Sequence, residues 1–337
     1  MKTSLHPADV LYAGGRPFPA LAACEHFAGS EKLIRKALEL QTKLQADGVP
    51  LFDITADCED GAPAGGEIEQ ATMVARLLNS PDNRFSRMGV RIHDAHHDFW
   101  RAEVEILLRE AAPRIPYIVL PKPTCLVDVQ TQLTWINDTL ARHRYDLNIP
   151  VHVLIETPGA LHDAWQIAAL PQVESLDFGL MDFVSAHHGA IPASAMRSPG
   201  QFAHPLIVRA KCEIAAAALG NGIVPTHNVT TEFRDASVVA DDAHRAREEF
   251  GFLRMWSIHP NQIEPIVQAM RPSFDETLTA ATILATASDA DWGPIQIDGR
   301  LHDRASYRYY WELLQRAHST GAELPASTAR FFNFHPA

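Results

Sequence analysis

The sequence lacks the features that mark several large classes of protein. Its four cysteines lie far apart along 337 residues and form no C-x-x-C pair, which indicates reduced thiols rather than a disulfide framework. No apolar run approaches the roughly 18 residues of a membrane span. The first residues also lack the apolar segment of a secretory signal. We therefore expect a cytoplasmic protein with no membrane partner.

Basic charge is scarce as well. The chain has 29 Lys and Arg against 41 Asp and Glu, a net charge of −12. Non-specific nucleic-acid binding needs a basic surface, so we expect no nucleic-acid partner. The hydrophobic content of 46% is ordinary for a globular protein. The length suits two domains, or one large α/β barrel with an extension.

Familiar nucleotide-binding and hydrolase motifs are also missing. The chain contains no G-x-G-x-x-G, no Walker G-x-x-x-x-G-K, no G-x-S-x-G and no H-E-x-x-H. A doubly wound sheet usually carries the first of these after its first strand, so its absence argues against that architecture.

What the sequence does contain is a regular alternation of strand-like and helix-like segments. Several strand-like runs, such as the one ending at Leu120, are continuously apolar, which is typical of strands buried on both faces of a parallel sheet. The predicted strands are residues 10–15, 51–57, 88–93, 117–121, 151–156, 175–182, 223–227 and 253–259. The predicted helices are residues 30–47, 67–79, 98–112, 126–143, 159–170, 201–219 and 235–250. Eight strands that alternate with helices predict a (β/α)8 barrel.

The pattern changes after Pro272. Residues 273–290 and 303–318 read as helices, separated by turns. This tail is too small to form its own core. We therefore predict a barrel domain over residues 1–272 and a helical lid over residues 273–337.

Charged side chains follow the predicted strands at the barrel's carboxyl end, where active sites of this fold lie. They are Asp57, Glu59, Asp60, Arg91, Lys122, Glu156 and Asp182. Glu156 and Asp182 suit either Mg²⁺ binding or the capping of the next helix. The acidic cluster at 57–60 suits either a polar shell around a site or a solvated turn. Arg91 suits either a carboxylate clamp or a salt bridge to that cluster.

Histidines gather just after one of these strands. His93, His96 and His97 resemble a cluster of metal ligands. Consecutive loop histidines are more often surface residues, and we favour that interpretation over a zinc site.

Seven segments at the strand ends resemble motifs of the HpcH/HpaI aldolase and citrate lyase β-subunit family, which includes malyl-CoA lyases. Their order and spacing run through almost the whole chain. The matching segments are Asp57-Cys58-Glu59-Asp60, Arg91-Ile92-His93 (for R-V-N), Val119-Leu120-Pro121-Lys122, Leu154-Ile155-Glu156-Thr157, Phe178-Gly179-Leu180-Met181-Asp182, Phe233-Arg234-Asp235 and Ile258-His259-Pro260-Asn261-Gln262-Ile263.

The resemblance implies a barrel of the pyruvate/phosphoenolpyruvate type in a trimer or hexamer. Glu156 and Asp182 would bind Mg²⁺, and Arg91 would hold the carboxylate of a 2-keto acid. Glu59, Asp60 and Lys122 would contribute to substrate binding. An aspartate of the lid, reaching in from a neighbouring subunit, would act as the acid or base. Asp303 is the candidate for it and Asp298 the alternative.

Some positions depart from the family pattern. Ala8 stands where members have an arginine before the first strand, and residues 13–15 replace a Pro-Gly after it. The segment after Glu156 and the loop 187–205 also differ.

The function that the resemblance implies is a Mg²⁺-dependent carbon–carbon lyase. It would cleave or form a 3-hydroxyacyl-CoA, such as a malyl- or citryl-CoA-like thioester, from an acyl-CoA and a 2-keto acid. Two alternatives remain: a class II pyruvate aldolase that uses a free aldehyde, and a citrate lyase β-type subunit that is active only with partner chains.

Overall fold

The computed structural model describes residues 6–12, 18–46 and 48–332. These residues divide into two compact units. One covers 21–270, and the other combines the described residues up to 20 with those from Arg271 onward. No helix in the described ranges is long and apolar enough to cross a membrane.

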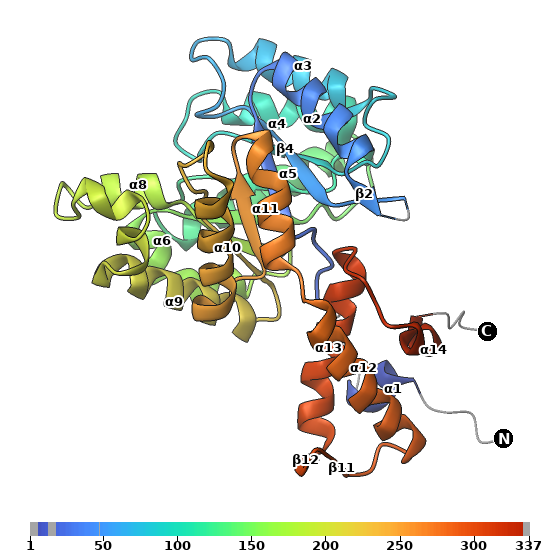
Figure 1. Cartoon of the computed structure of the whole chain (residues 1–337). Coiled ribbons are helices and arrows are strands. Elements are labelled where there is room, and N and C mark those ends of the chain that lie inside the picture. Colours follow the sequence, from blue (N-terminus) through green and yellow to red (C-terminus); the bar gives the residue numbers. More distant parts are fainter. Residues whose placement is uncertain (1–5, 13–17, 47, 333–337) are drawn as a thin grey trace. The chain divides into compact units, whose positions relative to one another are not determined.

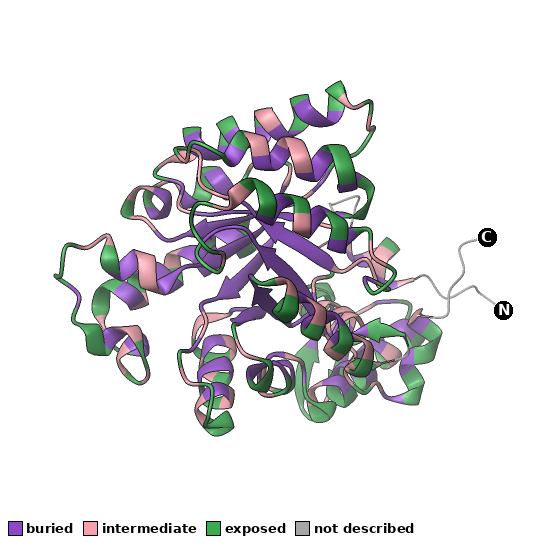
Figure 2. Ribbon diagram, turned by 90° about the horizontal axis from the view of Figure 1, so that it is seen from above, coloured by how far each residue is buried: buried purple, intermediate pink, exposed green. Residues whose placement is uncertain are grey.

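Eight parallel strands close into a barrel in the larger unit, which confirms the predicted (β/α)8 fold (Figure 1). Neighbours around the barrel follow the chain, and the last strand pairs with the first. The strands are β1 (Cys24–Ala28), β4 (Phe52–Asp57), β5 (Met88–Arg91), β6 (Ile118–Leu120), β7 (Val151–Ile155), β8 (Val173–Phe178), β9 (Val224–His227) and β10 (Arg254–Ser257). Figure 2 shows that the strands are buried and that the surrounding helices expose their outer faces.

The helices around the barrel follow the predicted segments closely. Ser30 caps the first of them through a hydrogen bond from the Leu33 amide, and Asp235 caps a later one from the Ser237 amide. The helices are α2 (Glu31–Lys43), α3 (Glu67–Leu78), α4 (Trp100–Ala111), α5 (Leu126–Arg142), α6 (Pro158–His162), α7 (Ala164–Ala168), α8 (Leu180–Ser185), α9 (Pro205–Gly220), α10 (Ala236–Phe250) and α11 (Pro260–Met270). A short hairpin of β2 (Gln45–Ala46) and β3 (Val49–Pro50) follows α2.

The prediction of the first strand was wrong. Val10 and Leu11 lie in the helix α1 (Pro7–Leu11), and residues 13–15 lie outside the described residues. The first barrel strand is β1, whose sequence CEHFA is buried throughout although it contains Glu25 and His26. Ala8 lies in α1 and not before a barrel strand, so its comparison with the arginine that precedes the first strand in family members does not apply.

The smaller unit is built on two long helices, α12 (Phe274–Asp289) and α13 (Arg304–Ser319). A hairpin of β11 (Ile295–Ile297) and β12 (Arg300–His302) joins them, and α14 (Ala329–Phe332) ends the described chain. The described residues up to 20 belong to this unit, whereas the prediction assigned them to the barrel. Leu11 shares a core with Trp311, and the His6 ring donates to the Phe331 carbonyl oxygen over 2.9 Å.

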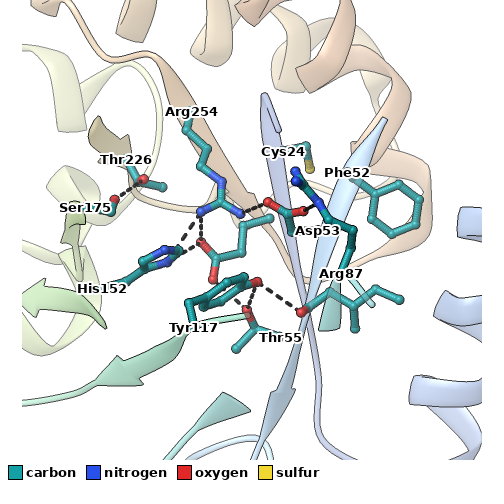
Figure 3. Close-up of polar contacts among 12 residues, drawn as sticks. Cys24, Phe52, Asp53, Thr55, Arg87, Tyr117, His152, Ser175, Thr226 and Arg254 are labelled. Carbon is teal, nitrogen blue, oxygen red and sulfur yellow. Dashed lines mark hydrogen bonds and ion pairs between the residues drawn. The ribbon is translucent and has the colours of Figure 1, made fainter. Parts of the chain in front are cut away.

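The barrel interior contains a buried ion-pair network at the starting half of the strands (Figure 3). The Arg254 guanidinium lies 2.5 Å from Asp53 and 3.1 Å from Glu25, and Arg87 reaches Asp53 from outside over 2.6 Å. His152 lies 3.7 Å from Glu25. Burial alone would raise the pKa of Glu25, but Arg254 and His152 lower it to about 2. The network therefore joins β1, β4, β7 and β10 through compensated charges.

Candidate active site

The structure brings the predicted charged residues together at the carboxyl end of the barrel. Asp57 and Arg91 end β4 and β5, and Glu156 directly follows β7. The predicted strand 175–182 is shorter than expected, because β8 ends at Phe178 and Asp182 lies in the first turn of α8.

Arg91 forms a salt bridge to the acidic cluster, as one of its two interpretations predicted. Its Nε and Nη2 donate to the two oxygens of Asp57 over 2.7 and 2.5 Å, and Nη1 lies 3.0 Å from Glu59. Burial alone would lower the pKa of Arg91, but these two carboxylates raise it. Two of the five guanidinium N–H groups donate to Asp57, and Nη1 forms an ion pair without a hydrogen bond to Glu59.

Lys122 connects the acidic cluster with the segments that follow β7 and β8. Its Nζ contacts Glu59, lies 2.8 Å from Asp60 and lies 3.8 Å from Asp182. Burial alone would lower the pKa of Lys122, but these carboxylates raise it, and in turn Lys122 lowers the pKa of Asp60 against the effect of its burial. The backbone N–H of Lys122 donates to Glu156 Oε1 over 2.6 Å.

Glu156 is a buried carboxyl without full charge compensation. Burial and the nearby Asp182 raise its pKa to about 8, although Arg91 lowers it. Gly179 makes room for it, since a Cβ there would lie 2.1 Å from Glu156 Oε2.

A divalent cation fits this position. Glu156 and Asp182 offer carboxylate oxygens, the ligands that Mg²⁺ prefers. The Asp182 side chain is 41% exposed, which leaves room for water and a chelating ligand. A cation there would offset the negative charge of the two carboxylates.

A second group of possible metal ligands lies deeper in the barrel. One ligand atom each of Glu25, His152 and Asp177 falls within 4.8 Å of the others. Although burial lowers it, Glu174 and Glu25 raise the pKa of His152 to about 9, so its ring is protonated and both of its nitrogens are donors rather than metal ligands. We assign this group to the interior ion-pair network.

The lid aspartates lie in the smaller unit. Asp303 is the N-cap of α13, where its Oδ1 accepts from the Ala305 amide over 3.0 Å. Asp298 lies in the turn between β11 and β12, with φ at 49°.

Of the histidines after β5, His93 differs from the surface residue that we predicted, whereas His96 agrees with it. His93 is 14% exposed at its side chain, and its Nδ1 lies 2.6 Å from the buried Glu103. His96, by contrast, is 64% exposed. In the described part of the chain, the three histidines do not form a group that could hold a metal. One feature of the sequence indicates a place for His93 near the site: it follows Arg91 by two residues, just after the end of β5.

Comparison with known proteins then decides the family. The sequence model of the HpcH/HpaI aldolase/citrate lyase family matches residues 52–260. The chain belongs to this family. Its members are carbon–carbon lyases, and this protein is an enzyme of that class.

Individual relatives agree with this assignment. A crystal structure of a citrate lyase from Burkholderia xenovorans is 54% identical, with a TM-score of 0.85 over 97% of this chain and all of that one. The L-malyl-CoA/β-methylmalyl-CoA lyase of Rhodobacter capsulatus is 25% identical over 78% of this chain and 86% of its own length. CitE of Mycobacterium tuberculosis, solved with magnesium, acetoacetate and coenzyme A, is 21% identical with a TM-score of 0.65, over 89% of this chain and 99% of that one, and shows the shared fold.

Proposed function

We propose that the protein is a Mg²⁺-dependent lyase that cleaves or forms a 3-hydroxyacyl-CoA from an acyl-CoA and a 2-keto acid. The observation that carries this proposal is the buried Glu156 carboxyl beside Asp182, at the carboxyl end of the barrel, with a pKa raised to about 8. The names of the malyl-CoA lyase relatives support the thioester, and the ligands of CitE support the metal.

The charged residues at the carboxyl end of the barrel have separate roles in the proposed reaction. Glu156 and Asp182 would hold Mg²⁺, which supplies Lewis-acid stabilisation of negative charge on oxygen. Arg91 hydrogen-bonds only Asp57 among the described residues, and its other N–H groups would bind the keto-acid carboxylate and offset charge that develops beside it. Asp57 and Glu59 fix the orientation of that guanidinium, and Lys122 keeps Glu59 and Asp60 in place.

We assign proton transfer to Asp303 of a neighbouring subunit. In the condensing direction its carboxylate takes a proton from the α-carbon of the acyl-CoA. The resulting enolate carbon forms a bond to the keto carbon, and the keto oxygen takes up a proton to become the hydroxyl group. Cleavage reverses these steps.

Mass spectrometry of reaction products tests the proposal. The pure protein is incubated with Mg²⁺, a mixed acyl-CoA pool and several 2-keto acids. We expect a new thioester that is absent with Glu156→Gln and present with Glu110→Gln, a matched change of an exposed carboxylate on α4. Absence of any thioester product contradicts the proposal. Product from pyruvate and a free aldehyde would then indicate an aldolase, and activity only with added partner chains would indicate a citrate lyase β-type subunit.

A further inference from the structure

A pair of buried basic side chains lies between β9 and α9. Lys211 and His227 are both fully buried, and the Lys211 Nζ lies 2.6 Å from the His227 Nε2. Lys211 also donates to Gln201 Oε1 over 3.1 Å, and within the described ranges it forms no ion pair with a carboxylate. Neither basic group has a role in the proposed reaction.

The hydrogen bonds fix the number of protons that this pair can hold. The Asn228 carbonyl oxygen lies 2.9 Å from His227 Nδ1 and can only accept, so Nδ1 carries the ring hydrogen. Nε2 of the neutral ring then accepts from Lys211, and one hydrogen lies between the two nitrogens. A second positive charge would direct two donors at each other over 2.6 Å. The contact is therefore compatible with one positive charge at most.

The pair also holds part of the loop between β8 and α9, which includes the 3₁₀ turn η3 (Gly200–Phe202). Loops that follow barrel strands form the active-site face of this fold. Gln201 is fully buried, and its Oε1 accepts from both Lys211 and Asn228. Its Nε2 donates to Asp242 of α10 over 3.0 Å. All the polar atoms of this side chain are thus bonded to elements that follow the loop.

The Phe202 ring forms the other side of the contact. Lys211 Nζ lies 3.8 Å from the ring centroid, and the His227 ring stacks on Phe202 with 5.5 Å between centroids. An aromatic face can stabilise a single cation. Because Gln201 and Phe202 both contact the basic pair, the position of η3 depends on that pair.

Burial opposes further protonation of both groups. In the described part of the chain, the charged residues that act on Lys211 lie on α10; they are Asp242 and Glu249, which favour its charge, and Arg245, which opposes it. Burial outweighs them and holds the pKa of Lys211 well below its ordinary value of 10.5. Burial and the nearby Lys211 hold the pKa of His227 well below 6.5, although its bond to Asn228 raises it.

We propose that the Lys211–His227 contact is a proton-operated latch on the loop between β8 and α9. The latch is closed while the pair carries one positive charge at most, and it opens when a further proton makes both groups positive. Opening releases Gln201 and Phe202, and with them one of the loops at the carboxyl end of the barrel. The inference does not depend on the identity of the substrate.

The direction of the pH effect follows from the two states of His227. In the open state the ring has its ordinary pKa of about 6.5, and in the closed state its pKa is lower. As pH falls below about 6.5, the open state binds a proton that the closed state lacks. The ring then weakens the closed state about tenfold per pH unit, and above this range it contributes no such effect.

Hydrogen–deuterium exchange of the full-length protein, followed by mass spectrometry, measures the opening. After correction for the intrinsic pH dependence of exchange, the protection of residues 200–204 should show this added loss below about pH 6.5. His227→Gln should not show it, because an amide oxygen can accept from Lys211 but takes up no proton in this range. His244→Gln, which removes an exposed histidine of α10, is the matched control and should retain it.

Two other titratable groups contact the loop and provide the competing explanations. Asp242 accepts from Gln201, and His204 lies at the end of the loop, where its amide donates to the Gly200 carbonyl. If the added loss of protection persists in His227→Gln, the latch is overturned. Its disappearance in Asp242→Asn or His204→Gln would then assign it to that group.

Nitrogen NMR of the ring-labelled wild-type protein keeps the test valid if His227→Gln fails to fold. We expect the His227 ring to stay neutral, with its hydrogen on Nδ1, at every pH at which residues 200–204 are protected. A charged ring in the protected state contradicts the inference.

Discussion

At the residue scale, the raised pKa of Glu156 would couple the proposed binding of Mg²⁺ to pH. Its pKa of about 8 in the folded protein lies above the ordinary value of 4.5, so between these values the folded state binds more protons than the unfolded state. The free energy of unfolding of the metal-free protein therefore falls as pH rises through this range. Mg²⁺ needs the carboxylate, and its binding must displace that proton.

We expect the affinity for Mg²⁺ to rise about tenfold per pH unit up to about pH 8 and then to level off, because one proton is released. Isothermal titration of Mg²⁺ at several pH values measures this slope. Glu156→Gln should bind Mg²⁺ weakly and without the slope. A wild-type affinity that does not change with pH would show that Glu156 is not the group that titrates.

The sequence was informative about residues that directly follow strands. Asp57, Arg91, Lys122 and Glu156 were found because apolar runs end just before them, and the closed barrel then brings those ends together. The contact between His93 and Glu103 could not be predicted from the sequence. Glu103 lies ten residues later on a helix, and only the packing of α4 against the barrel places its buried carboxylate at His93.

At the element scale, the first barrel strand shows where a prediction from the pattern of apolar residues fails. Strand prediction depends on apolar runs, and β1 carries Glu25 and His26 within five residues. Glu25 is tolerated there because Arg254, more than 200 residues away, and His152 supply positive charge. The apolar residues Val10 and Leu11 look more like a strand, but they pack as a helix in the smaller unit.

Disruption of the buried ion-pair network should lower the free energy of unfolding by a large amount. Arg254→Met would leave Glu25 and Asp53 buried without their shared partner, and we expect a loss of about 3–5 kcal/mol in the free energy of unfolding. Urea denaturation followed by circular dichroism measures it. Arg109→Met on α4 is the control, since this exposed arginine pairs with the exposed Glu110 and should cost less than about 1 kcal/mol. Equal costs for the two variants would contradict the role of the network.

At the scale of the whole molecule, the division into two units bears on how the site is completed. Every metal and substrate candidate lies in the barrel unit, whereas Asp303 lies in the smaller unit that also includes α1. Asp303→Asn should abolish turnover and leave Mg²⁺ binding intact, because the metal candidates are on other elements. Retained turnover would remove Asp303 from the mechanism.

Mixed oligomers decide which subunit provides Asp303. Glu156→Gln and Asp303→Asn are each expected to be inactive alone. If Asp303 acts in the barrel of a neighbour, random co-assembly of the two variants gives about one quarter of the sites an intact Glu156 and an intact Asp303, and activity returns to about that level. If Asp303 acts within its own chain, every site lacks one of the two groups and the mixture stays inactive. Light scattering on the same samples shows whether the active species is the expected trimer or a hexamer, and a monomer with activity would exclude the shared site.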